Sequence, residues 1–225
     1  MIDAQAEYLA YLRRAGEVRD VDGAFAVKTG ADSNTENGVV ARGPVAAVKE
    51  LVGWFGETPA SWLDLAGANH DALVAAGAKP EIDGWEISAS LTDLAVEAPH
   101  GIEVREVHEL GRWFELAGDD FATLRPVYER LLGSQLRFYV ADNVGFAAAF
   151  YGEASALFTH LGVAPHARRR GVATALAAAR LRDAREHGCD RVVLAPSPHG
   201  SGLYASFGLT VRRTPPNRWY YLPVR

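Results

Sequence analysis

A helix that crosses between two strands, over residues 157–195, is the feature that most constrains how this chain can fold. Apolar runs predict strands at Leu157–Val163 and Arg191–Ala195. Apolar residues at helical spacing predict a helix that follows Gly171 and ends at His187-Gly188. Three cations fall in its last turns, where they favour the helix dipole: Arg180, Arg182 and Arg185. This arrangement predicts a mixed α/β fold.

Residues 101–225 are predicted to form one domain, in which a mixed and largely antiparallel sheet is flanked by helices. Turn residues such as Asp142-Asn143 separate two of the strands and give them the form of a hairpin. The other predicted elements are a strand at 101–107, helices at 108–117 and 125–132, strands at 136–141 and 145–151, a short helix at 201–207, and a last pair of strands at 209–212 and 218–222.

Residues 1–97 repeat the later part of this order, which we interpret as an internal duplication that is degenerate in sequence. The predicted elements are strands at 24–28 and 39–41, a helix at 45–54, a strand at 61–65, a helix at 70–76 and a final strand at 85–91. Asp93–His100, which contains Pro99, is the predicted linker. The chain is therefore predicted to hold two domains in tandem, 1–97 and 101–225.

The composition is that of an ordinary globular protein. The 225 residues are 48% hydrophobic and 23% charged, and the formal net charge of -5 argues against a general nucleic-acid binder. No apolar run approaches the ~20 residues of a membrane span, and the first residues show no signal-peptide pattern. Cys189 is the only cysteine, so an internal disulfide is excluded and a reducing compartment is favoured. We therefore expect a cytoplasmic protein without a membrane partner.

Three consecutive arginines, Arg168–Arg170, directly precede Gly171 and the predicted helix. The first N–H groups of a helix have no intrahelical partner, and the helix dipole adds partial positive charge there. Gly171 lets the backbone approach a ligand closely, and the small side chain of Ala173 does not obstruct that approach. The pattern predicts a site for phosphate or pyrophosphate, and a solvated basic loop is the alternative. It is not a P-loop, because no Gly-Lys-Ser/Thr follows, and it is not a dinucleotide fingerprint, because only one of the three required glycines is present.

Two motifs together resemble the GNAT superfamily of acyl-CoA-dependent N-acyltransferases. One is Leu161-Gly162-Val163 at the end of a strand, followed by the Arg-x-x-Gly-x-Ala pattern of Arg168–Ala173. The other is Ser197, followed seven residues later by Tyr204. The resemblance covers residues 101–225, and in outline the first half as well. It implies two tandem GNAT-like domains, with the fourth and fifth strands of the second domain splayed apart.

The resemblance implies that acetyl-CoA is the cosubstrate and that it binds to the C-terminal domain. Its pyrophosphate would lie on the backbone amides of Arg168–Thr174, and its pantetheine arm along Leu161–Val163 like an added strand. The residues implied in binding are Leu161, Gly162, Val163, Arg168, Arg169, Arg170, Gly171, Val172, Ala173, Thr174 and Ser197. Ser197 departs from the family pattern, which commonly has asparagine at this position.

The resemblance further implies that an amine attacks the thioester directly, within a ternary complex and without an acyl-enzyme. The backbone N–H of Val163 would stabilise the oxyanion, and Tyr204 would be the general acid toward the CoA thiolate. A packing role for the Tyr204 ring is the alternative. The expected reaction moves an acetyl group to a primary amine of a small molecule or a peptide. A non-catalytic acyl-CoA sensor and transfer of a longer acyl group are the rival interpretations.

The general base is left open by the sequence. Glu153 and His160 are the main candidates, and the unperturbed pKa of ~6.5 of a histidine suits this task. Strand alternation places His160 and Leu161 on opposite faces without saying which face the substrate occupies, and a packed histidine is the alternative for His160. The other residues considered are Thr159 and His199 as bases, and Asp119 and Asp120 as partners of a cationic acceptor or as helix caps.

The first half lacks the features that would bind CoA. The corresponding place is Val40–Val45, where the Arg-x-x-Gly-x-Ala pattern is missing and Pro44 has no N–H to donate. We expect residues 1–97 to have a structural role and to form part of the acceptor cleft. No metal is expected, because His187 and Cys189 have no second pair of ligands. The protein is expected to be a monomer or a homodimer.

Overall fold

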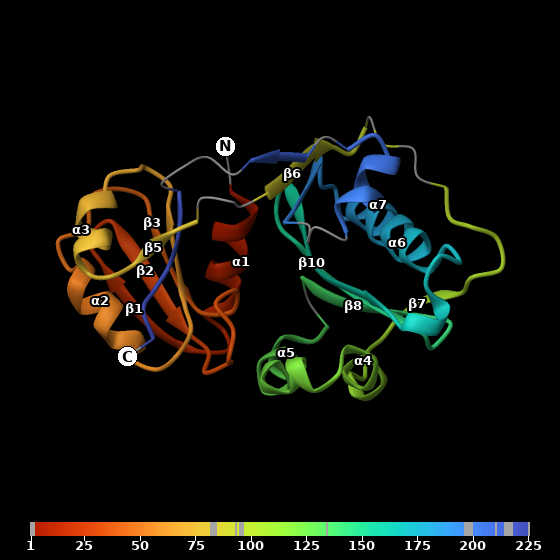
Figure 1. The fold of residues 1–225 in the computed structure, drawn as a ribbon, viewed down its shortest axis with the longest axis horizontal. Helices are drawn as coiled ribbons and strands as arrows, with labels where there is room; N and C mark the ends of the chain where they lie inside the picture. Colours follow the sequence, from red (N-terminus) through yellow and green to blue (C-terminus); the bar gives the residue numbers. More distant parts are fainter. Residues whose placement is uncertain are drawn as a thin grey trace. The chain divides into compact units, whose positions relative to one another are not determined.

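The computed structural model of the chain describes residues 3–81, 85–92, 94, 97–133, 135–195, 200–209, 211–213 and 218–224. Ser197 and His199, two of the predicted site residues, lie outside the described residues. The chain divides into two compact units (Figure 1): unit 1 consists of Met1–Ala4, Trp85–Arg125 and Leu132–Arg212, and unit 2 of Gln5–Gly84, Pro126–Leu131 and Arg213–Arg225. Each unit holds one mixed sheet flanked by helices, which confirms the predicted fold class.

Unit 1 is built on a seven-stranded sheet with the order β12-β6-β11-β10-β9-β8-β7. Its strands are β6 (Trp85–Ser90), β7 (Val104–Glu106), β8 (Leu136–Ala141), β9 (Gly145–Tyr151), β10 (Ser155–Val163), β11 (Arg191–Leu194) and the greater part of β12 (Val211–Arg213). Its helices are α4 (Gly111–Ala117), η1 (Asp119–Leu124), η2 (Pro165–Ala167), α6 (Val172–Glu186) and α7 (Ser201–Ser206). The β10–β11 pair is parallel, and α6 provides the crossover that a parallel pair requires. The predicted strand–helix–strand crossover is therefore confirmed.

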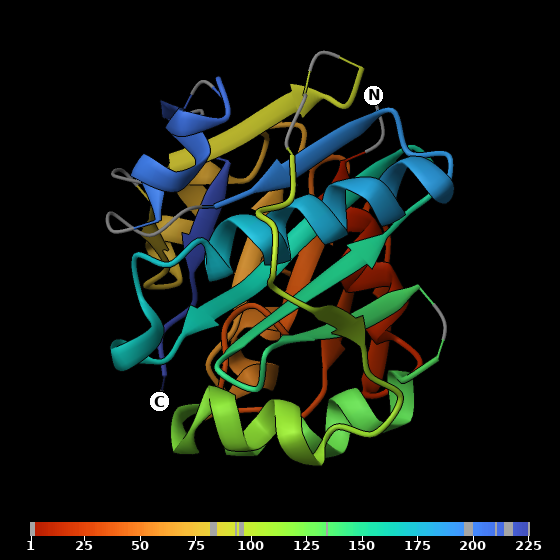
Figure 2. The ribbon, with the colours of Figure 1, turned by 90° about the vertical axis from the view of Figure 1, so that its right-hand side faces the viewer.

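The sheet of unit 1 carries α6 on one face and α4 on the other. α6 packs against β8, β9 and β10, and Figure 2 shows it lying across these strands. Tyr139 and Ala147 of the sheet belong to the core on the α6 side. Trp113 of α4 packs edge-on against Phe138 and Phe146, the sequence neighbours of those two residues. Because side chains alternate along a strand, these phenylalanines point to the opposite face.

Unit 2 is built on a six-stranded sheet with the order β1-β2-β3-β4-β13-β5. Its strands are β1 (Glu17–Val21), β2 (Ala24–Lys28), β3 (Gly38–Ala41), β4 (Ser61–Asp64), β5 (Lys79–Pro80) and β13 (Trp219–Tyr221). Its helices are α2 (Val48–Phe55), α3 (His70–Ala75) and the greater part of α1 (Ala4–Leu12) and α5 (Arg125–Leu131). Trp62, Phe55 and Tyr220 are fully buried at the centre of its core.

Hydrogen bonds explain why α5 belongs to unit 2 although its neighbours in sequence belong to unit 1. The buried Tyr128 hydroxyl donates to Glu36 Oε1 at 2.8 Å, and the Tyr11 hydroxyl donates to the Leu131 carbonyl at 2.9 Å. Burial, together with the negative charge of Glu36, raises the pKa of Tyr128, so this phenol stays protonated and remains a donor.

The two sheets exchange one strand each. β6 precedes the predicted linker in sequence, yet it pairs with β11 through Ile87 and Leu194. β13 is the last strand of the chain, and it pairs with β4 through Tyr220 and Trp62. The predicted pair of strands at 209–212 and 218–222 is therefore wrong, because β12 and β13 lie in different sheets. The predicted boundary between residues 97 and 101 does not coincide with the two units for the same reason.

The connections of unit 2 follow the same order as those of the second half of unit 1. β3, α2, β4, α3 and β5 succeed each other as β10, α6, β11, α7 and β12 do. The exchanged strand also takes the same place, since β13 lies between β4 and β5 and β6 lies between β11 and β12. The two units therefore share one topology over this stretch.

Across the part of the chain that the structure describes, no helix combines the length and the apolar character needed to cross a membrane.

Candidate functional site

β10 extends beyond its partner β11 and leaves a gap between the two strands. Their pairing ends at Phe158 and Leu194, whereas β10 continues to Val163 along β9. The register on β9 shifts between Phe158 and Leu161, which marks a bulge. The Ala164 N–H donates to the Val144 carbonyl on the β9 side at 2.8 Å. Because successive N–H groups of a strand alternate, the Val163 N–H points away from β9 and into the gap.

Gly162 stands at this end of β10 because a larger residue would collide with β9. A Cβ atom at this position would lie 2.3 Å from Cε1 of the Phe146 ring. Gly162→Ala is expected to lower the stability of the protein by about 1–3 kcal/mol, as overpacking of a core does, measured by chemical denaturation. Gly111→Ala is the control, since a Cβ there meets nothing within 4 Å. Equal stabilities of the two variants would contradict this account of Gly162.

The N-terminus of α6 has the geometry expected of an anion site. Gly171 precedes the helix with a φ of 86°, in the left-handed region that favours glycine, and no side chain caps the helix. The first intrahelical bond runs from the Ala175 N–H to the Gly171 carbonyl. The N–H groups of the preceding turn, from Val172 to Thr174, therefore have no partner within the helix and remain available to a ligand.

The three arginines lie on an exposed loop that joins β10 to α6. Arg168 Nε donates to the Val163 carbonyl at 3.1 Å, so this side chain ties the loop to the end of the strand. Arg169 has a φ of 63°, which is uncommon for a residue with a side chain and marks a tight turn. The exposed arginines add positive charge around the N-terminus of α6.

Tyr204 is brought together with the end of β10. It lies on α7 with only 6% of its surface exposed, and it belongs to the core cluster that contains Phe158 and Leu194. Leu161 and Val163 pack against the same cluster. The strand end and the tyrosine therefore border the same core cluster.

Arg180 is a residue near this site whose place the sequence pattern did not predict. The predicted role is that of a cation in the last turns of the helix, but the side chain is fully buried beneath the sheet. Its Nη2 donates to the Tyr204 hydroxyl at 3.2 Å. The spacing from Val172 and Leu176 places residue 180 on the buried stripe of the helix, and this is the signal that could have identified it.

The two candidate bases, His160 and Glu153, lie in different places, the first within β10 and the second before it. The His160 ring packs edge-on against Trp113 at 6.0 Å and Phe121 at 5.0 Å between ring centroids, on the face that α4 and η1 cover. Leu161 packs against the core on the α6 side, so the two neighbours point to opposite faces. Glu153 is exposed before the start of β10. At ~3.3 Å per strand residue it lies more than 20 Å from Val163, which argues against Glu153 as the base.

Two tyrosines and an aspartate occupy the inner side of α6 beyond Arg180. The Tyr139 hydroxyl donates to Asp183 at 2.8 Å and lies 2.6 Å from the Tyr151 hydroxyl. Burial raises the pKa of Tyr139 and that of Tyr151, and the positive charge of Arg180 acts against the rise at Tyr151. Asp183 also accepts hydrogen bonds from Arg182. This acid is thus occupied by partners other than Arg180.

The remaining candidates do not form a further site. Asp119 and Asp120 are exposed at the start of η1, where no side chain caps the helix. Among the described residues, no cluster of three or more histidine, cysteine, aspartate or glutamate side chains could hold a metal ion. Cys189 is buried, and its thiol lies 3.7 Å from the Gly152 carbonyl.

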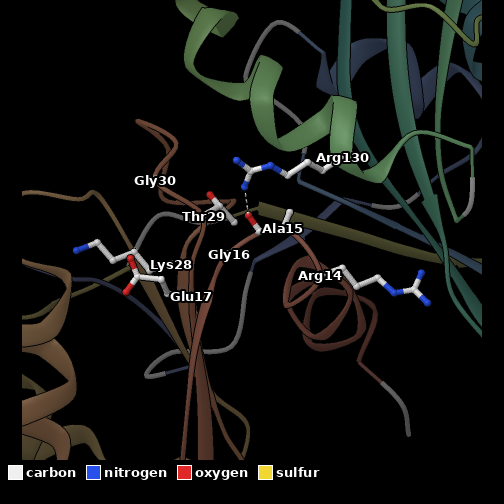
Figure 3. A pocket seen from close by; sticks show the side chains of 8 residues that line it. All are labelled: Arg14, Ala15, Gly16, Glu17, Lys28, Thr29, Gly30 and Arg130. Carbon is white, nitrogen blue, oxygen red and sulfur yellow. Dashed lines mark hydrogen bonds between the residues drawn. The ribbon is translucent and has the colours of Figure 1, made fainter.

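Unit 2 contains a separate open cavity of about 380 Å³, which Figure 3 shows between the ends of β1 and β2 and residue Arg130. Its cations are engaged by other groups of the protein. Arg130 donates to the Ala15 carbonyl at 2.9 Å, Lys28 donates to the Trp54 carbonyl at 3.3 Å, and the Arg14 guanidinium lies over the Tyr11 ring. The cavity therefore shows no cluster of charges directed at a ligand.

Part of unit 1 matches a known protein family. Residues 134–210 match a family model described as an acetyltransferase (GNAT) domain, and this range includes β8–β11, α6 and Tyr204. A comparison with curated protein sequences gives no match.

Solved structures resemble the chain over most of its length. A GCN5-related N-acetyltransferase from Kribbella flavida is 19% identical with a TM-score of 0.62, and the match covers 96% of this chain and 92% of that chain. A functionally unknown conserved protein from Staphylococcus epidermidis is 10% identical with a TM-score of 0.61, covering 98% and 96%. A GCN5-related N-acetyltransferase from Sphaerobacter thermophilus is 16% identical with a TM-score of 0.51, covering 90% and 78%. These likenesses show a shared fold that includes both sheets.

Proposed function

We propose that this chain, whose residues 134–210 match the acetyltransferase (GNAT) domain model, transfers an acetyl group from acetyl-CoA to a primary amine. The gap between β10 and β11 carries the proposal: the Val163 N–H turns into it, and Tyr204 lies in the core beside it. An acyltransferase that uses direct attack needs an N–H at the carbonyl oxygen and an acid at the sulfur. Both groups are present in unit 1.

We propose that the cosubstrate binds along β10 and at the N-terminus of α6. The free edge of β10 over residues 159–163 can accept an extended pantetheine arm as an added strand. The uncapped N–H groups after Gly171 suit a pyrophosphate, and the exposed Arg168–Arg170 suit its charge. Acetyl-CoA supplies the activated acetyl group as a thioester.

Each residue then has one role in the reaction. The Val163 N–H stabilises the carbonyl oxygen as negative charge develops on it during attack by the amine. Tyr204 donates its phenolic proton to the sulfur as the bond between sulfur and the acetyl carbon breaks. The amine loses a proton to water or to a side chain, and His160 remains the proposed candidate for that side chain.

We propose that unit 2 does not bind acetyl-CoA. All four residues of β3 are paired with β4, from Gly38 to Ala41, so these strands show no gap like that after Phe158. Pro44 offers no N–H before α2, and the Val45 N–H is already bonded to Asn69 Oδ1 at 2.8 Å. The helix that corresponds to α7 is α3, which contains no tyrosine. Unit 2 is then a structural partner that arose by duplication.

Turnover with a panel of amines tests the proposed function. The protein is incubated with acetyl-CoA and spermidine, an aminoglycoside, free lysine or a short peptide, and release of the CoA thiol is followed with a thiol reagent. At least one amine is expected to give sustained release, and buffer alone none. Tight binding of acetyl-CoA without turnover of any amine would favour the sensor. Faster turnover of propionyl-CoA or succinyl-CoA would favour a longer acyl group. Cys189 is the only cysteine and is buried, so it adds little background.

A further inference from the structure

A buried cation without a carboxylate partner lies next to the proposed general acid. The Arg180 side chain is fully buried on α6. Its Nη1 donates to the Ala148 carbonyl at 3.2 Å and to the His160 carbonyl at 3.3 Å, and its Nη2 donates to the Tyr204 hydroxyl at 3.2 Å. The guanidinium also lies 4.3 Å from the centroid of the Phe158 ring. Within the part of the chain that the structure describes, no carboxylate pairs with Arg180, and its Nε has no hydrogen-bond partner.

Packing alone does not account for an arginine at this position. Residue 180 continues the buried stripe of Val172 and Leu176, where a leucine or a methionine would fill the space without bringing a charge. Burying a charge without an opposite charge costs free energy. The only buried acid of α6, Asp183, is bonded to Tyr139 and Arg182. Neither packing nor an ion pair therefore explains the charge at this position.

We propose that Arg180 is a positioning residue that orients the Tyr204 hydroxyl for proton donation, an inference that rests on the proposed role of Tyr204. A guanidinium carries donors only, so the Tyr204 oxygen must accept the hydrogen bond between them. The phenolic proton is then not used in this bond. Among the described residues, no other group accepts it, so it is available to an acceptor in the gap.

The same guanidinium connects Tyr204 to the bulge in β10. Ala148 lies on β9 and His160 on β10, and their carbonyls meet at one nitrogen of Arg180 where the register between the strands shifts. The guanidinium is planar and holds its donors in a fixed fork. It therefore sets the position of the Tyr204 oxygen relative to the strand that carries Val163. A lysine has a single ammonium on a flexible stem and cannot reproduce this geometry.

Every bond and proton in the proposed transfer is accounted for. The carbon–sulfur bond of the thioester breaks, the O–H bond of Tyr204 breaks, and an S–H bond forms on the departing CoA. The phenolate that remains lies beside the Arg180 cation, which stabilises its charge. The attacking amine gives up one proton as the amide forms. That proton, carried by solvent, restores the phenol for the next turnover.

A double-mutant cycle between Arg180 and Tyr204 tests the proposal. Arg180→Met is expected to lower kcat roughly tenfold, the value of one charge-assisted hydrogen bond. In a Tyr204→Phe background the same substitution is expected to change kcat less than about twofold, because the group it acts through is gone. Affinity for acetyl-CoA, measured by calorimetry, should stay within about twofold in all variants. Arg182→Met on the exposed side of α6 is the matched control, and its kcat should equal that of the wild type.

Equal losses of kcat from Arg180→Met in both backgrounds would overturn the inference, because a structural role is additive with that of Tyr204. An unchanged kcat in the wild-type background would overturn it as well. Where Arg180→Met fails to fold, Arg180→Lys takes its place in the same cycle, with the same non-additive loss expected. A Tyr204→Phe single variant with full activity would instead remove the proposed role of Tyr204 itself, and this outcome is read from the single variant alone.

Discussion

Tyr204→Phe is expected to lower kcat by roughly a hundredfold, in the range of a positioned general acid. The substitution removes one hydroxyl and keeps the ring, so the packing of Tyr204 against its core cluster should change little. A thiolate with a pKa of ~8–9 can leave without a proton, although less readily. Affinity for acetyl-CoA should barely change, because the lost interaction is made mainly in the transition state.

The measurement is kcat and acetyl-CoA affinity for both proteins with any accepted amine. Tyr151→Phe is a suitable control, since Tyr151 is also buried in unit 1 and its hydroxyl bonds to Tyr139. This control tests whether loss of a buried phenol hydroxyl in the same core is enough to reduce the rate. Equal kcat values for wild type and Tyr204→Phe would make Tyr204 a packing residue, with the proton coming from water.

The elements around the site could be predicted because their signals are local. The apolar run at Leu157–Val163, the helical spacing after Gly171 and the short helix with Tyr204 each depend on neighbours within a few residues. The structure confirms all three elements, as β10, α6 and α7. The left-handed φ of Gly171 does not follow from its place before a helix, because a residue at that position ordinarily has an extended backbone.

The exchange of strands could not be predicted in the same way. β6 and β13 each have the pattern of a strand, and the sequence predicts both. Pattern alone does not choose the partner, because β11 and β4 both offer an edge for an antiparallel neighbour. The choice is made by tertiary packing over long separations in sequence, and the nearest predicted strand is then the wrong partner.

The positions of the side chains in the site could likewise be predicted only where a local pattern determines them. Helical spacing places residue 180 on the buried stripe of α6, yet the charge of an arginine normally indicates an exposed position. The hydrogen-bond acceptors of its guanidinium lie on β9, β10 and α7, and only the folded structure brings them together. The face taken by His160 also depends on the bulge after Phe158, which period-two alternation cannot anticipate.

A negative charge at Gly171 is expected to weaken acetyl-CoA binding far more than an uncharged side chain of the same size. Gly171 has a φ of 86°, which asparagine and aspartate tolerate better than other residues. Gly171→Asn and Gly171→Asp therefore bring nearly equal backbone strain. Each also places a Cβ about 3.0 Å from Pro99 Cγ, so the steric cost is shared. The difference between the two variants isolates the charge.

The Asp variant is expected to bind acetyl-CoA about ten- to a hundredfold more weakly than the Asn variant, or ~1.4–2.8 kcal/mol. The physical reason is repulsion between the carboxylate and a pyrophosphate held at the N-terminus of α6, at partly screened distances of a few ångströms. Calorimetric titration of acetyl-CoA measures the two affinities. Raising the salt concentration should reduce the difference between them. Equal affinities at low salt would place the pyrophosphate away from Gly171. A difference in affinity that does not change with salt would mean that the aspartate acts by changing the loop conformation, and not by repelling the pyrophosphate.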